Sequence, residues 1–333
     1  MSLKPLNRQT IVITGASSGI GLATAYMAAE RGAKLVLVSR NDKALSGIVR
    51  QIRSKGGQAI HVVADVSKRA DHEAVAKAAI RAFGSFDTWV NNAGLSVFGR
   101  LDEISDEDHR QVIDVNFWGV VYGSTVAAHY LRRNGGAIVN LGSVASDVAL
   151  PLQGMYTASK HAIKGFTDAF RMELAHEGAP ISLTLIKPAS INTPFPVHAK
   201  NYMKRTPKLP PPIYKPEDVA RAILHAAEHG GRDYYIGGGG KVMSLVNQHL
   251  PGLVDKVGAH MMLHRTYTNE RATGDQSGAL FRAGRDGDVH GETPHMVMPA
   301  IYTRATMRPV LSTALLAVAG LAVTALLGAK KGS

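Results

Sequence analysis

The chain has 333 residues, of which 45% are hydrophobic and 19% charged, a composition that supports a sizeable folded core and argues against disorder throughout. It contains no cysteine, which excludes disulfide bonds, thiolate metal sites and cysteine nucleophiles. The formal net charge is +12, yet no basic stripe with interleaved aromatic residues occurs, so we expect no nucleic-acid partner. The excess of positive charge is compatible with a solvated basic surface, with attraction to anionic lipid or with binding of a phosphate-bearing cofactor.

Strand-like and helix-like segments alternate over the first 190 residues. Apolar runs predict strands at Thr10–Thr14, Lys34–Ser39, Ala59–Ala64, Phe86–Asn91, Ala137–Leu141 and Ile181–Ile186. Helical spacing between them is clearest at Ala70–Phe83 and Asp106–Arg132. Continuous apolar runs such as Leu35–Val38 are typical of strands buried on both faces. The alternation therefore predicts an α/β protein with a doubly wound parallel sheet, the Rossmann fold.

A proline-rich segment interrupts this alternation. Pro188–Pro216 holds eight prolines, including the run Pro210–Pro212. A long irregular segment in a compact domain is usually functional, so we interpret residues 189–215 as a substrate lid, with a passive surface excursion as the alternative. A helix over Pro216–His229 and a last strand over Arg232–Gly237 then complete one α/β domain, residues 8–240.

The character of the sequence changes after Gly240. Helical spacing at Lys241–His264 predicts a helical extension over residues 241–272, and the polar stretch that follows predicts a linker over residues 273–308. Val310–Gly328 contains no charge, and a helix of that length would span about 28 Å, close to the hydrocarbon core of a bilayer. We therefore expect a membrane anchor at residues 309–328, with a buried or interfacial helix as the alternative.

A glycine-rich turn follows the first predicted strand and opens a helix. It reads Gly15-Ala16-Ser17-Ser18-Gly19-Ile20-Gly21. Glycines let backbone amides approach a pyrophosphate, and the helix N-terminus adds unpaired N–H groups. In this strand–turn–helix context the motif predicts a dinucleotide site.

The second predicted strand ends in Ser39-Arg40, where an NAD site usually has an acidic residue for the ribose 2′-hydroxyl. A hydroxyl and a guanidinium suit a 2′-phosphate instead, so the sequence favours NADP. Asp42, nearby, keeps NAD open. Asp65, followed by Val66, is expected to accept from the adenine amino group, with a helix N-cap as the alternative.

Tyr156 and Lys160 lie four residues apart on a predicted helix, so their side chains share one face. A phenol is a poor acid–base catalyst at neutral pH, and a nearby ammonium lowers its pKa. Ser143 closes the fifth predicted strand, and Asn116 lies on the helix after the fourth. Because ligands bind at the carboxyl ends of the strands in open α/β sheets, these side chains are candidates for one catalytic site.

These segments, together with Asn91-Asn92-Ala93-Gly94, resemble the motif set of the short-chain dehydrogenases/reductases over roughly residues 8–240. The resemblance implies a Tyr156 general acid/base, a Lys160 that lowers its pKa and holds the nicotinamide ribose, a Ser143 that orients the carbonyl, and an Asn116 that holds a relay water. Asn91 would support the sheet. Pro188-Ala189 departs from the Pro-Gly usual in the family.

The implied site residues are the following. The catalytic set is Asn116, Ser143, Tyr156 and Lys160. The cofactor set is Gly15, Ser17, Ser18, Gly19, Ile20, Gly21, Ser39, Arg40, Asp65, Val66, Asn92, Ala93, Gly94, Tyr156, Lys160, Pro188, Ile191 and Thr193.

The sequence thus predicts an NADP(H)-dependent oxidoreductase that interconverts a ketone and a secondary alcohol. Apolar lid residues favour a lipid-like substrate, such as a steroid or a fatty-acyl derivative; they are Phe195, Val197, Tyr202 and Met203. A non-catalytic, membrane-tethered cofactor sensor or scaffold is the alternative. The pattern His225–His229 spells HxxEH, but no third ligand is evident, so we expect no metal.

Two expectations concern the setting of the enzyme. No apolar run near the N-terminus is long enough for an export signal, so we expect a catalytic domain in the cytoplasm, either membrane-associated or soluble. The family resemblance implies a homodimer or homotetramer built through the helices around residues 105–133 and 155–177.

Overall fold

A computed structural model describes residues 3–263, 266–293 and 296–307. Seven parallel strands form one sheet in the order β12-β7-β6-β4-β1-β2-β3. The strands are β1 (Thr10–Thr14), β2 (Lys34–Ser39), β3 (Gln58–Val63), β4 (Thr88–Asn91), β6 (Gly136–Leu141), β7 (Ile181–Pro188) and β12 (Asp233–Ile236). The predicted fold class, a doubly wound Rossmann sheet, is confirmed.

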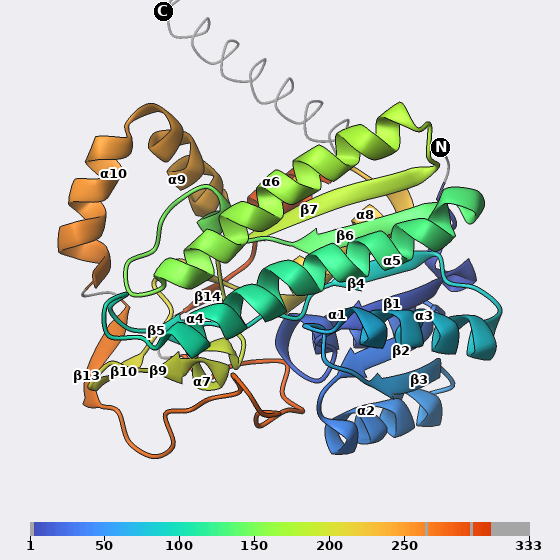
Figure 1. The fold of residues 1–333 in the computed structure, drawn as a ribbon, viewed down its shortest axis with the longest axis horizontal. Coiled ribbons are helices and arrows are strands. Elements are labelled where there is room, and N and C mark those ends of the chain that lie inside the picture. Colours follow the sequence, from blue (N-terminus) through green and yellow to red (C-terminus); the bar gives the residue numbers. More distant parts are fainter. Residues whose placement is uncertain (1–2, 264–265, 294–295, 308–333) are drawn as a thin grey trace, which may run out of the picture.

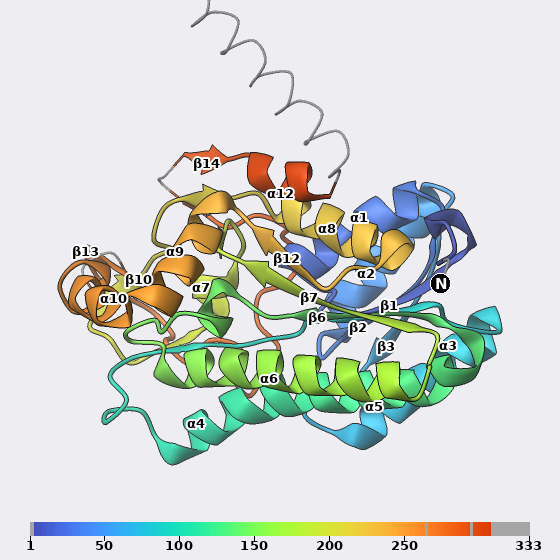
Figure 2. The same cartoon turned by 90° about the horizontal axis from the view of Figure 1, so that it is seen from above.

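Helices cover both faces of the sheet, as Figures 1 and 2 show. One layer holds α1 (Gly19–Glu30), α2 (Asp42–Ser54) and α8 (Pro216–His229), and the other holds α3 (Arg69–Phe83), α5 (Gly119–Asn134) and α6 (Gly154–His176). Successive strand residues point to opposite faces, so Ile11 and Ile13 join one hydrophobic cluster while Val12 joins the other. Burial on both sides explains why these strands are continuously apolar.

The helix predicted over Asp106–Arg132 is interrupted in a way that the spacing does not indicate. It consists of α4 (Asp106–Ile113), a π-helical turn (Asp114–Trp118) and α5. Asn116 lies inside the π-helical turn, a distortion that is frequent at functional sites.

The proline-rich segment contains short elements rather than a structureless loop. They are β8 (Ser190–Ile191), α7 (Phe195–His198), β9 (Lys200–Asn201), β10 (Arg205–Pro207) and β11 (Ile213–Tyr214). Three of the strands pair with distant parts of the chain: β9 with β5 (Val97–Phe98), β10 with β13 (Tyr267–Arg271), and β11 with β14 (Val297–Met298). Backbone pairing therefore anchors the segment on several sides.

The C-terminal region is helical over most of the expected extension, but it contains a strand at the end of that extension and further elements where a linker was expected. Helices α9 (Gly238–His249) and α10 (Pro251–Val257) and a π-helical turn (Gly258–Met262) precede β13, which is a strand. Beyond residue 273 the chain contains β14 and α12 (Ile301–Thr306). Asp218 holds α12 in place, because its carboxylate accepts from the backbone N–H of Ala300 and from Arg304. The polar composition of this region does not predict these contacts, because many of its hydrogen bonds are made by backbone groups.

The expected membrane anchor at residues 309–328 lies outside the described residues. Among the residues that the structure does describe, no helix combines the length and the apolar character needed to cross a bilayer.

Candidate active site

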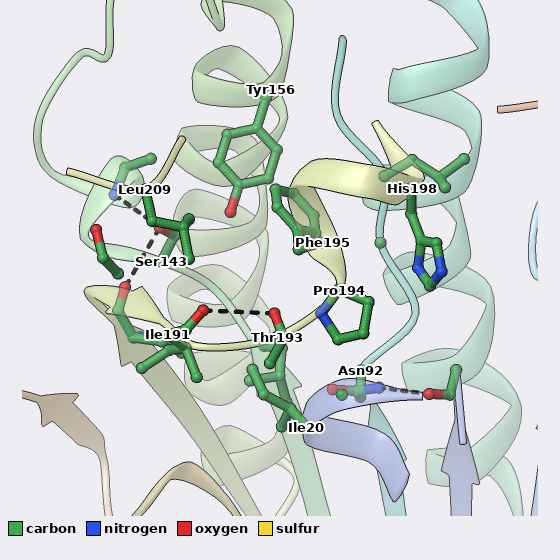
Figure 3. Close-up of a pocket in the computed structure, with 18 of the residues that line it drawn as sticks. Ile20, Asn92, Ser143, Tyr156, Ile191, Thr193, Pro194, Phe195, His198 and Leu209 are labelled. Carbon is green, nitrogen blue, oxygen red and sulfur yellow. Dashed lines mark hydrogen bonds between the residues drawn. The ribbon is translucent and has the colours of Figure 1, made fainter. Parts of the chain in front are cut away.

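A cavity of about 520 Å³ opens at the carboxyl ends of the central strands (Figure 3). Its lining includes most of the residues that the sequence assigns to a site: Gly15, Ser17, Ser18, Gly19, Ile20, Ser39, Arg40, Asp65, Val66, Asn92, Ala93, Gly94, Ser143, Tyr156, Lys160, Pro188, Ile191 and Thr193. Gly21 and Asn116 are not in the lining and act from behind it. Residues from nearly every strand end thus converge on one space.

The glycine turn is shaped by backbone conformations and close approaches. Gly15 and Gly19 have φ values of +64° and +54°, in the left-handed region that favours glycine. A Cβ on Gly21 would lie 2.1 Å from the carbonyl oxygen of Gly15, so no side chain fits there. The Asn92 side chain donates to the Thr14 carbonyl at 2.8 Å and fixes the turn to the end of β4. The turn is therefore tightly curved at the N-terminus of α1, the geometry that lets a pyrophosphate approach the backbone.

Tyr156, Lys160 and Ser143 come together at the other end of the cavity. Tyr156 and Lys160 lie one turn apart near the start of α6, and the Lys160 Nζ is 5.6 Å from the centre of the Tyr156 ring. The Nζ donates to the Leu141 carbonyl oxygen at 2.8 Å. Ser143 caps a short 3₁₀ helix after β6, and its hydroxyl donates to the Pro188 carbonyl oxygen at 3.4 Å. In Figure 3 the Tyr156 hydroxyl points into the cavity.

The surroundings of this pair change the proton affinity of both groups. Burial raises the pKa of Tyr156, and the hydrogen bond with Ser143 only partly opposes this shift. Burial lowers the pKa of Lys160 to about 8. The direction for Tyr156 is opposite to the one expected from a neighbouring ammonium, because loss of hydration around the phenol outweighs the other effects. Tyr156 therefore carries its proton at neutral pH, as a general acid must.

Asn116 and Asn91 hold the frame of the site. The Asn116 side chain clamps Leu95 by accepting from its N–H at 2.7 Å and donating to its carbonyl at 2.9 Å, and it also donates to Ser159. Asn91 donates to Ser124 and Asn140 within the buried layer. Both asparagines thereby connect strand ends to the helices behind the cavity.

The part of the cavity at the end of β2 is in contact with a distant segment of the chain, which the sequence does not indicate. Arg40 donates to the backbone carbonyls of Ala279, Leu280 and Arg282, which belong to the expected linker. Asp65 lines the cavity while its Oδ1 accepts from the backbone N–H of Ser67 at 3.0 Å. No local signal could have found the Arg40 contacts, because they join residues about 240 positions apart and use main-chain acceptors.

The substrate end of the cavity is apolar, but most of its residues differ from those expected. Phe195 lies 5.6 Å from Tyr156 between ring centres. Val197 is 69% exposed, and Tyr202 turns away to donate to Asp108. Neither these two nor Met203 lines the cavity. Leu209 and the run Pro210–Pro212, which belong to the predicted lid, do line the cavity, and apolar lining residues that the sequence did not indicate include Phe98, Val144, Leu150, Pro151, Met243 and Val257.

A buried ionic network supports the loop that carries Ser143. The Lys187 ammonium, on a side chain only 2% exposed, lies 3.3 Å from carboxylate oxygens of both Asp147 and Asp233. Tyr235 and Ser244 donate to the same Asp147 carboxylate at 2.7 and 3.0 Å. Burial alone would raise the pKa of Asp147, but these hydrogen bonds and the Lys187 charge together hold it below its usual range.

The HxxEH pattern on α8 has a structural role. Its Glu228 accepts from the backbone N–H of Leu6 at 3.0 Å and from the Arg31 guanidinium at 2.8 and 2.9 Å. The carboxylate thus fastens the N-terminal segment and α1 to α8.

Comparison with known proteins places this fold and site in a family. A family model described as short chain dehydrogenase matches residues 9–202. The chain therefore belongs to the short-chain dehydrogenase family, and it is an oxidoreductase.

Two relatives show how far the similarity extends. An uncharacterized oxidoreductase, YxnA of Bacillus subtilis, is 44% identical over 321 residues, which cover 95% of this chain and 90% of the relative. The 11-beta-hydroxysteroid dehydrogenase A of Sesamum indicum is 38% identical over 236 residues, 67% of each chain. The first match is long enough to include most of the C-terminal region beyond the residues that the family model covers.

Solved structures agree with the architecture. A short-chain dehydrogenase/reductase from Burkholderia phymatum in complex with NAD superposes with a TM-score of 0.64 and 28% identity, covering 81% of this chain and all of the other. An alcohol dehydrogenase from the archaeon Thermococcus sibiricus complexed with 5-hydroxy-NADP gives 0.60 and 28%, covering 68% of this chain and 95% of the other.

Proposed function

We propose that the protein interconverts a ketone and a secondary alcohol with a nicotinamide dinucleotide. The observation that carries this proposal is the continuity of one cavity from the glycine turn to Tyr156, Ser143 and Lys160. The glycine turn at one end of the cavity suits the pyrophosphate of a dinucleotide. The hydroxyl groups of Tyr156 and Ser143 at the other end suit a substrate carbonyl. The reaction would be hydride transfer, and a bound nicotinamide dinucleotide would supply or accept the hydride.

Distinct residues would perform the remaining tasks. Tyr156 would donate its proton to the carbonyl oxygen, which its raised pKa favours at neutral pH. Ser143 would donate a second hydrogen bond to the same oxygen and hold the carbonyl in line with Tyr156. Lys160, anchored on the Leu141 carbonyl, would stabilise the phenolate that forms and return a proton to it.

The glycine turn would hold the pyrophosphate, since Gly15 and Gly19 line the cavity where the N-terminus of α1 begins. Thr193 and Ile191, at the edge of the same cavity, would meet the nicotinamide carboxamide. The adenosine ribose would lie beside Ser39 and Arg40, the residues from which the sequence predicts NADP. That preference stays a prediction.

The substrate that fits best is apolar. Phe195, Leu209 and Leu150 line the space around Tyr156, and burying a lipid-like ketone there would remove apolar surface from water. The name of the Sesamum relative, a hydroxysteroid dehydrogenase, supports a substrate of this class. Oxidation of the reduced dinucleotide across a panel from small polar ketones to steroids and long-chain ketones tests the proposal. Absence of turnover throughout the panel would refute it.

The rate of reduction is expected to fall as the pH rises through about 8. Burial lowers the pKa of Lys160 to about 8, so its ammonium is lost above that pH and no longer stabilises the Tyr156 phenolate. Profiles of kcat/KM from about pH 6 to about pH 10 would show one descending limb. Lys160→Arg, which keeps its charge over this range, should remove that limb from whatever activity it retains. An unchanged limb in this variant would assign the titration to another group.

A cofactor-binding scaffold on the same fold is the alternative function. It would bind the dinucleotide but need neither Tyr156 nor Ser143 within the same cavity. Measured turnover with any carbonyl excludes it, whereas dinucleotide binding without turnover favours it.

Membrane attachment through residues 309–328 remains part of the proposal, supported by the uncharged run Val310–Gly328. We expect the full-length chain to sediment with membranes and a chain ending at residue 307 to remain in the supernatant. Fractionation of both forms measures this, and a full-length chain found in the supernatant would contradict it.

Self-association through α5 and α6 is also proposed. Trp118, just before α5, and Met172 on α6 are 41% and 66% exposed, respectively. Large apolar side chains on these helices suit a homodimer or homotetramer, whose mass light scattering would measure.

A further inference from the structure

Residues 276–291, here called the C-terminal strap, cross the rim of the cavity at the glycine turn. At one end Asn201 donates its backbone N–H to the Gln276 carbonyl at 2.9 Å. At the other end Gly287 donates to the Ser17 carbonyl, and Gly19 donates to the Asp288 carbonyl, both at 2.9 Å. In Figure 1 the strap is part of the orange loop that runs past α7. The strap thus forms an outer wall of the cofactor half of the cavity.

The strap also contacts Arg40, whose guanidinium is the reason that the sequence predicts binding of the 2′-phosphate of NADP. Arg40 donates to three strap carbonyls, those of Ala279, Leu280 and Arg282. Ala279 and Leu280 are themselves buried, so the contact is well packed. Hydrogen bonds to these neutral acceptors occupy much of the donor capacity that a phosphate would use.

A carboxylate from the strap enters the same corner. Asp286 lines the cavity, together with Ser17, Ser39 and Arg40, and its side chain is only 9% exposed. Its Oδ2 accepts from the Asn41 side-chain amide at 2.9 Å. Asn41 is fixed in turn, because its Oδ1 caps α2 by accepting from the Ala44 N–H at 3.1 Å. The strap therefore delivers an acidic group to a place where β2 itself provides none.

We propose that Asp286 is the residue that selects the dinucleotide, and that it selects NAD over NADP. A ribose 2′-hydroxyl can donate to a carboxylate, whereas a 2′-phosphate, which is anionic, is repelled by one at close range. Arg40 could offset that repulsion only with its charge and with the N–H groups that the three strap carbonyls leave over. This inference rests on the proposed function, names the cofactor of that site, and reverses the preference that Ser39-Arg40 alone suggests.

Asp286→Asn tests the proposal directly, because it removes the charge and keeps the size of the side chain. The readout is the affinity of the full-length protein for NADH and for NADPH, measured by calorimetric titration without a carbonyl substrate. We expect the unmodified protein to bind NADH more tightly, and the variant to shift the ratio of the two dissociation constants toward NADPH by about tenfold or more.

Asp288→Asn is the matched control. Asp288 is two residues away on the same strap, its side chain is exposed, and it contacts Gly19 only through its backbone carbonyl. It changes the net charge equally and is expected to leave the ratio unchanged. Asp286→Ser, a second neutral variant, guards against a misfit peculiar to asparagine and should shift the ratio in the same direction.

Each other outcome overturns the inference in a recognisable way. A preference for NADPH that Asp286→Asn leaves unaltered would show that Arg40 decides the choice. If Asp286→Asn increased the affinity for NADH and for NADPH equally, Asp286 would oppose cofactor binding without discriminating between the two. If the ratio stays unchanged while carbonyls are reduced, only this inference fails. If neither dinucleotide binds and no carbonyl is reduced, the proposed function fails with it.

Discussion

Tyr156→Phe is expected to lower kcat for carbonyl reduction by about a thousandfold or more while leaving dinucleotide affinity within about twofold. The substitution removes the hydroxyl that points into the cavity, and with it the proton for the carbonyl oxygen. The ring remains, so its packing against Phe195, at 5.6 Å between ring centres, is preserved. Steady-state rates and dinucleotide titrations on the same preparation separate the two effects.

The matched control is Tyr26→Phe. The Tyr26 hydroxyl donates to Gln51 on the surface of the α1–α2 layer and takes no part in the cavity. This control should keep full activity. If Tyr156→Phe retained most of its turnover, the proton would have to come from another group, and the proposed role of Tyr156 would be wrong.

Lys187→Met is expected to lower the free energy of unfolding by about 3–5 kcal/mol. The ammonium is almost completely buried and lies between the carboxylates of Asp147 and Asp233, which would lose their shared buried cation in the variant. Because Asp147 follows the short helix that Ser143 caps, activity should fall as well. Denaturant unfolding followed by circular dichroism measures the change in stability.

Lys164→Met is the matched control for the same carboxylate. The Lys164 Nζ lies 3.8 Å from Asp147, but this lysine side chain is 39% exposed, so water screens the pair. Its loss should cost less than about 1 kcal/mol. If both variants lost the same amount of stability, the burial of Lys187 would make no additional contribution, and the prediction would be wrong.

The catalytic and pyrophosphate residues were predictable because their signals are short and local. The glycine turn follows β1 directly, Tyr156 and Lys160 are separated by one helical turn, and Ser143 comes two residues after β6. In a parallel sheet all strand ends meet at one edge, so positions read from the sequence converge in space without further information. The boundaries of β1 and β2 also match the apolar runs residue for residue.

The substrate lining was less predictable, since a proline-rich segment has no periodicity from which side-chain directions follow. Phe195 faces Tyr156, whereas Val197 is exposed and Tyr202 bonds Asp108. Pairing with β5, β13 and β14 decides which side chains face the cavity, and those partners are distant in sequence.

The sequence by itself determined the fold class, the glycine turn and the Tyr156–Lys160 pair, because periodicity and spacing within about twenty residues carry that information. Only the tertiary structure decided the sign of the Tyr156 pKa shift, since burial depends on what packs around the phenol. It alone also decided the environment of Arg40. The strap that meets this guanidinium reads as a polar linker, and it contacts Arg40 through backbone carbonyls that every residue possesses and no sequence pattern distinguishes.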